Sequence, residues 1–152
     1  MMRRAPPALL KFLARYDSGV KSLALALRTI ALEELVPCHE YIFQMRSKVV
    51  LVYSVTDRVI ADGICHIAVL RHHVTLVFSD GADLDDPGHL LRGQGVTMRH
   101  IKILASTDLA RPELRSFLQQ ARTLAVRTSG PGPIRRGVVT RVKKPSAPNV
   151  SR

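Results

Sequence analysis

Side chains that could bind a ligand or take part in catalysis are concentrated in one stretch of the sequence, between Phe78 and Leu104. A loop in this stretch carries four aspartates and a histidine, namely Asp80, Asp83, Asp85, Asp86 and His89. Carboxylate oxygens bind hard cations, and histidine together with carboxylate suits iron or manganese. We therefore predict a candidate metal site with iron as its candidate cofactor, and the predicted ligands are Asp83, Asp85, Asp86 and His100.

The same loop also has a purely structural interpretation. It lacks the ligand spacing of a calcium-binding loop, and no pair of histidines at helical spacing fixes two metal ligands. Aspartates often cap turns by accepting backbone hydrogen bonds, and residues 85–88 read Asp-Asp-Pro-Gly, a dense turn signal. At the level of sequence, metal binding and turn capping both stay open.

A second candidate site uses basic residues of the predicted sheet. The candidate ligand-binding residues are His66, Arg99, His100 and Lys102. On a semi-polar sheet face they can receive a small anion or a peptide carboxylate. Arg99 alternates with isoleucines, so a buried guanidinium there needs carboxylate or carbonyl partners. A salt bridge to the loop aspartates, which would pin the loop, is the competing interpretation.

No complete catalytic constellation is present in the sequence. Cys38-His39 and Cys65-His66 are adjacent pairs, and neighbours along a strand point to opposite faces, so neither pair forms a thiolate–imidazole dyad. There is no P-loop and no nucleophile elbow, and the glycine pair at residues 93–95 precedes a predicted strand instead of a helix. We therefore predict a non-catalytic protein in which Cys65 is a buried small hydrophobic residue.

Hydrophobic periodicity predicts an α+β domain over residues 1–126. Apolar residues spaced by three and four predict two N-terminal helices, up to Tyr16 and from Ser18 to Pro37, and a C-terminal helix beginning near Pro112. Runs rich in β-branched residues predict five strands, at residues 40–45, 48–54, 64–70, 73–78 and 98–104. Because the connections are short, we expect an antiparallel sheet of about five strands with the helices packed on it.

The positive charge is concentrated at the C-terminal end of the chain. Of the net charge of +11, residues 1–126 contribute 16 Lys and Arg against 12 Asp and Glu, whereas residues 127–152 contain seven basic residues and no acidic one. This segment is rich in Gly, Pro and Ser and lacks Leu and Phe, which predicts a flexible tail. Weak nucleic-acid contact through this charge is the alternative function, although no aromatic residue is present to stack on bases.

Composition favours a cytoplasmic protein. Two cysteines are too few for a disulfide framework, so free thiols in a reducing compartment are expected. No segment approaches the roughly 20 apolar residues that span a bilayer, and the first residues do not resemble a secretory signal. We expect a monomer or homodimer without a membrane span, whose partner is an unidentified small ligand or a metal.

One motif resembles a known family. The string GADLDDPGHLLRGQG, followed by MRHIKI and an apolar helix, resembles the YdhG-like domain family, the domain of unknown function numbered 1801. The preceding CHIAVLRHHVTLVF looks like the strand pair of those domains, and the similarity covers roughly residues 20–125. The matching positions are Gly81, Ala82, Leu84, Asp86, Pro87, Leu91, Gly93, Gly95, Arg99, His100 and Lys102.

The resemblance implies a bacterial cytosolic protein with helices packed on a curved antiparallel sheet. It implies an iron-chaperone role for one branch of the family and supplies no catalytic residue. The chain departs from the family pattern at Ser79-Asp80, where a basic residue is common, and in the basic segment after residue 126. The sequence thus predicts a non-catalytic small-ligand or metal-binding module.

Overall fold

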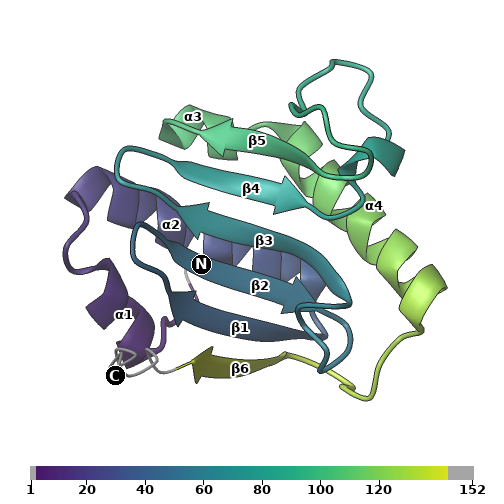
Figure 1. The fold of residues 1–152 in the computed structure, drawn as a ribbon, viewed down its shortest axis with the longest axis horizontal. Coiled ribbons are helices and arrows are strands. Elements are labelled where there is room, and N and C mark those ends of the chain that lie inside the picture. Colours follow the sequence, from purple (N-terminus) through teal and green to yellow (C-terminus); the bar gives the residue numbers. More distant parts are fainter. Residues whose placement is uncertain (1–2, 144–152) are drawn as a thin grey trace, which may run out of the picture.

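Helices cover one face of a six-stranded sheet (Figure 1). The structure is a computed structural model and describes residues 3–143. The helices are α1 (Pro7–Leu13), α2 (Ser18–Leu35), α3 (Ser106–Leu109) and α4 (Pro112–Ser129), with a 3-10 turn, η1, at Gly81–Asp83. The strands are β1 (Cys38–Gln44), β2 (Val49–Ser54), β3 (Gly63–Val69), β4 (Val74–Phe78), β5 (Arg99–Ile103) and β6 (Val138–Lys143). The α+β class and the helices α1, α2 and α4 are as the sequence predicts, whereas the four-residue helix α3 is an addition to the prediction.

The sheet is mixed, with the strand order β5-β4-β3-β2-β1-β6. The first five strands form the predicted antiparallel meander. The sixth pairs in parallel with β1, and Cys38 lies opposite Val138 in that register. The prediction of about five strands, all antiparallel, therefore needs correction: the chain returns from the end of α4 to the free edge of β1.

Strand β6 falls within the range that the sequence predicts as a flexible tail, and the first three residues of that range, up to Ser129, complete α4. An edge strand is held by main-chain hydrogen bonds and needs no Leu or Phe, so the low hydrophobicity of the segment does not prevent pairing. The Gly137 carbonyl accepts the Cys38 N–H at 3.1 Å as the strand begins. The remainder of the predicted tail, residues 144–152, lies outside the described residues.

The core lies between the sheet and the helices, and α2 and α4 are behind the sheet in Figure 1. The apolar stripes predicted for both helices are buried there, and the Phe117 ring meets Phe78 edge-on with 6.1 Å between centroids. Cys65 is buried among these residues as predicted, and Cys38 is buried as well. Burial raises the pKa of both thiols, that of Cys38 to about 12, so both stay protonated at neutral pH.

A buried polar network joins α2 to three strands. Arg28 donates two hydrogen bonds to the Glu40 carboxylate, from Nε at 2.8 Å and from Nη2 at 2.9 Å. The hydroxyls of Tyr53 and Thr140 each donate to the same carboxylate at 2.8 Å. Because Thr140 lies on β6, the carboxylate of β1 holds the added strand as well as the helix.

The opposite face of the sheet carries no helix of the described residues. Alternation places Tyr41, Phe43 and His66 on this face, and the rings of Tyr41 and Phe43 are 5.7 Å apart. In residues 3–143 no helix is both long and apolar enough to cross a membrane.

Candidate functional site

In the central loop, residues 79–98, the side chain of Asp86 caps a turn. Asp86 accepts the backbone N–H of Leu90 on Oδ1 and that of Leu91 on Oδ2, both at 2.9 Å. His89 closes the turn, with its N–H on the Asp86 carbonyl and a φ of 53°. Both carboxylate oxygens of Asp86 are therefore engaged by the backbone, which matches the turn-capping interpretation of this loop.

The loop is attached to α4 by a glutamine. Gln120 Oε1 accepts the Asp85 N–H at 2.7 Å, and Gln120 Nε2 donates to the Asp85 carbonyl at 3.2 Å. The two hydrogen bonds engage both the N–H and the carbonyl of Asp85, as pairing with a neighbouring strand does. Sequence reasoning missed this residue, because a glutamine on the polar face of a helix looks like any solvated side chain.

Arg99 does not pair with the loop aspartates. Its Nη1 donates to the carbonyls of Gly95 at 2.5 Å and Met98 at 2.6 Å. The prediction of a salt bridge to Asp83, Asp85 or Asp86 is therefore wrong, and the carbonyl partners that the sequence left open are the ones used. The guanidinium turns back over the loop that leads into β5, so carbonyls are closer to it than any carboxylate.

The four predicted metal ligands do not form a cluster. Asp83 ends η1, whereas the peptide of Asp85 and the carboxylate of Asp86 are engaged as described above. His100 lies on β5, where its N–H and carbonyl bond the backbone of Arg92. Within residues 3–143, no group of three or more His, Cys, Asp or Glu side chains is placed to hold a metal ion.

Three of the four predicted ligand-binding residues share the open face of the sheet. His66 and His100 both pair with Val77, one on each side, which places them about 10 Å apart at the usual strand spacing. Lys102 is two residues from His100 on the same face, whereas Arg99 points to the other face. None of the four lines the hollow formed by Arg15, Arg46 and Arg71 at one end of the sheet.

The burial of His66 predicts acid sensitivity. Burial lowers its pKa from 6.5, and the nearby Lys48 charge lowers it further. As the pH falls, His66 binds a proton in the unfolded chain before it does so in the folded protein. The free energy of unfolding therefore has its full value above the unfolded pKa of this histidine. It decreases as the pH falls through that pKa toward the folded pKa. We expect a lower Tm at about pH 5.5 than at pH 7.5. Burial also lowers the pKa of His39 and of His73, so His66→Gln should reduce this dependence in thermal unfolding without abolishing it, and an equally steep dependence in the variant would contradict the assignment.

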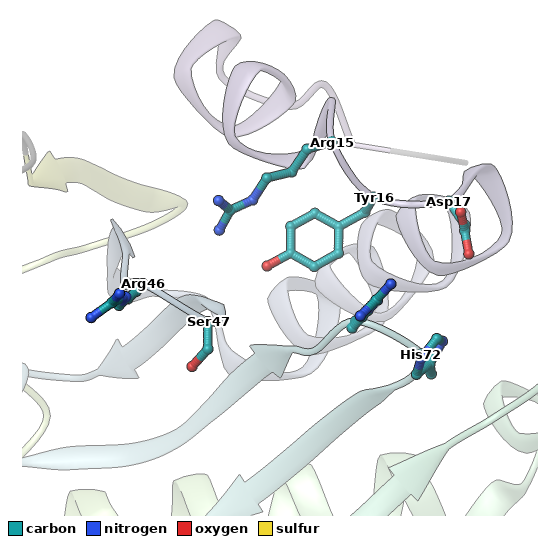
Figure 2. Close-up of a pocket in the computed structure, with 7 residues that line it drawn as sticks. Arg15, Tyr16, Asp17, Arg46, Ser47 and His72 are labelled. Atoms are coloured by element: carbon teal, nitrogen blue, oxygen red, sulfur yellow. The ribbon is translucent and has the colours of Figure 1, made fainter.

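Three arginines line a hollow at one end of the sheet, and Figure 2 shows this hollow in close-up with Arg15 and Arg46 labelled. We call it the arginine pocket; its volume is about 420 Å³, and it is lined by Arg15, Tyr16, Asp17, Arg46, Ser47, Arg71 and His72. The residues come from the α1–α2 connection, the β1–β2 turn and the β3–β4 turn. Segments far apart in sequence thus meet at the ends of two neighbouring hairpins.

Backbone contacts fix the three segments of the arginine pocket. The β1–β2 turn is closed by the Met45 N–H on the Lys48 carbonyl at 2.8 Å, and the β3–β4 turn by the Leu70 N–H on the His73 carbonyl at 2.9 Å. The Tyr16 hydroxyl donates to the Val69 carbonyl at 3.3 Å, which ties the helix connection to β3. Hydrogen bonds therefore fix the backbone of the two turns that line the pocket.

Positive side chains outnumber negative ones in the lining of the arginine pocket. Arg15 lies over the Tyr16 ring, 5.5 Å from its centroid, and Asp17 is the single carboxylate among the lining residues. In Figure 2 Arg15 and Arg46 lie on one side of the Tyr16 ring and Asp17 on the other. The ion pairs found in residues 3–143 use other arginines, so the three pocket guanidinia keep their donors available.

Sequence reasoning missed the arginine pocket. The predicted helices and strands leave residues 17, 46–47 and 71–72 in the connections between elements, and no binding role was predicted for them. One local signal was present, because tight turns usually carry Gly, Asn or Asp, whereas the β1–β2 and β3–β4 turns each carry an arginine. Their convergence depends on the register of the hairpins, which a list of turns does not reveal.

Neither a family model, nor a curated protein, nor a solved structure matches the chain. Membership of the YdhG-like family, which the loop motif predicts, stays a prediction.

Proposed function

We propose that this protein is a non-catalytic binding module for a small anionic ligand and that the arginine pocket is its site. The observation that carries the proposal is the convergence of Arg15, Arg46 and Arg71 from three segments without an ion-pair partner in the described residues. The three side chains are exposed and line one hollow, so an anion bound there would be attracted by all three positive charges.

The lining groups suit a phosphate or carboxylate group. A guanidinium presents a planar fork of N–H donors that matches the oxygens of these anions, and several such forks give geometric selectivity. The Ser47 hydroxyl can add a donor, and a volume of about 420 Å³ lies within the usual range for small-ligand sites. Asp17 opposes an anion, so the positive potential depends on the arginines outnumbering it.

A neighbouring helix terminus adds to the positive potential. The 18-residue helix α2 begins beside the pocket, after Asp17, and the Asp17 side chain makes no capping hydrogen bond. The first N–H groups of a helix have no intrahelical acceptor and carry a partial positive charge. This supports the same class of ligand as the arginines do.

Removing one pocket arginine tests the proposal. Calorimetric titration of the full chain with inorganic phosphate should show saturable binding, and Arg71→Ala should weaken it about tenfold, the loss expected for one charge-assisted hydrogen bond. Arg136→Ala is the matched control, because it removes the same charge from an exposed position outside the pocket. Equal losses in both variants would show a response to net charge alone and would contradict the site.

The nucleic-acid alternative gives a different outcome in a parallel titration. A single-stranded oligonucleotide held by the C-terminal charge would bind less tightly to Arg136→Ala than to Arg71→Ala, and its affinity would fall steeply with salt. Inorganic phosphate held in the arginine pocket responds to Arg71→Ala first. The order of the two variants therefore separates the two functions.

A further inference from the structure

We propose that the ligand of the arginine pocket is amphipathic, with its anionic group among the arginines and an apolar body in an adjoining groove. This inference rests on the proposed function and specifies the ligand class of the same site. The ligand would be a free alkyl or aryl phosphate or carboxylate. The groove, the two residues that it shares with the arginine pocket and its exposed apolar rim carry the inference.

The apolar groove lies beside the start of α2. Its volume is about 580 Å³, and it is lined by Asp17, Gly19, Val20, Ser22, Leu23, Ala26, His72, Leu104, Ala105, Ser106 and Leu109. No Lys, Arg or Glu is among these residues, and Asp17 is the single formal charge. Leu104 is 66% exposed on this lining, so it presents apolar surface to solvent that a bound hydrocarbon would cover.

The two hollows are neighbours. Asp17 and His72 line both of them, so a ligand that extends past these two residues would reach from the arginines into the groove. Gly19 lies on the groove lining just beyond Asp17, and a Cβ at this position would meet no atom within 4 Å. The surface of the first turn of α2 at Gly19 is therefore unobstructed.

The division of chemistry between the hollows sets the ligand class. An inorganic anion would use the arginines and leave the groove empty, whereas a purely apolar molecule would leave three cations unpaired. A molecule with one anionic end and an apolar body satisfies both halves. Burial of each methylene in the groove then adds to the affinity that the anionic group provides.

A chain-length series tests this inference. The full protein is titrated with inorganic, butyl and octyl phosphate, below the concentration at which octyl phosphate forms micelles. We expect affinity to rise about two- to fourfold per methylene, the lower value for a half-covered chain. Leu104→Ser should reduce this gain and leave the affinity for inorganic phosphate unchanged. Ile60→Ser is the matched control, because Ile60 is 72% exposed and lines neither hollow.

The outcomes separate this inference from the proposed function. Phosphate binding that depends on Arg71, with no effect of chain length, overturns the amphipathic ligand and leaves the anion site standing. Octyl phosphate binding that ignores Arg71→Ala overturns the anion site and, with it, the inference. Co-sedimentation with vesicles of phosphatidic acid and phosphatidylcholine, lost in both Arg71→Ala and Leu104→Ser, would assign the site to membrane lipid and overturn a free ligand.

Discussion

Glu40→Ala should lower the free energy of unfolding by about 3–5 kcal/mol, because it leaves the Arg28 guanidinium buried without its counter-ion. The side chains of this pair are 4% and 0% exposed, and the carboxylate also accepts the hydroxyls of Tyr53 and Thr140. Burial acts to lower the pKa of Arg28, but its hydrogen bond to Glu40 and the charge of Glu40 raise it overall. Urea unfolding at neutral pH measures the loss.

A partly exposed ion pair, in which the Glu34 side chain is 16% exposed, provides the control for Glu40. Arg115 donates to Glu34 at 2.7 Å, as short as the buried contact, but the arginine side chain is 41% exposed. Glu34→Ala should therefore cost less than about 1 kcal/mol. The double variant Arg28→Met/Glu40→Leu should recover much of the stability that Glu40→Ala loses, because no charge is left buried. Equal losses in Glu40→Ala and Glu34→Ala would contradict the role of burial.

Gly81→Ala should lower the free energy of unfolding by up to about 3 kcal/mol, since an added methyl has no space. A Cβ on Gly81 would lie 2.5 Å from the Cβ of Arg99 and 2.8 Å from its backbone nitrogen. Backbone atoms of a paired strand cannot move aside as the end of a side chain can. The central loop would have to separate from β5, and urea unfolding measures the cost.

Gly88 supplies the matched control for Gly81 in the same loop. A Cβ there would lie 3.7 Å from Leu90 Cγ, an ordinary van der Waals distance, and the residue is exposed. Gly88→Ala should change the free energy of unfolding by less than about 0.5 kcal/mol. An equally small change in the free energy of unfolding for Gly81→Ala would contradict the close packing of η1 against β5.

The motif of the central loop has structural roles in this protein. Gly81 permits the contact with β5, Asp86 caps the turn, and Arg99 ties the carbonyls of Gly95 and Met98 together. A motif of this kind identifies a fold more directly than it identifies a ligand. The groups proposed here to bind the ligand lie elsewhere, at the ends of the β1–β2 and β3–β4 hairpins.

The sequence by itself determined helices α1, α2 and α4 and the antiparallel meander of β1 to β5, but not α3 or β6. Helical spacing placed α2 and α4, and β-branched runs placed β1 to β5 within one or two residues, because these patterns depend on neighbours a few positions apart. Alternation also placed Cys65 in the core and His66 on the open face. The turn signal at residues 85–88 was visible for the same reason.

Only the tertiary structure decided which distant residues meet. Thr140 reaches Glu40 across 100 positions of sequence, and the arginine pocket joins three connections that no local pattern relates. The pairing of β6 depends on a free edge that exists only after β1 has folded into the sheet. Arg99 bonds backbone carbonyls instead of carboxylates, because its side chain lies over the loop that leads into β5. Such contacts follow from register and chain return, which are non-local, and they placed the candidate site away from the loop richest in chemical groups.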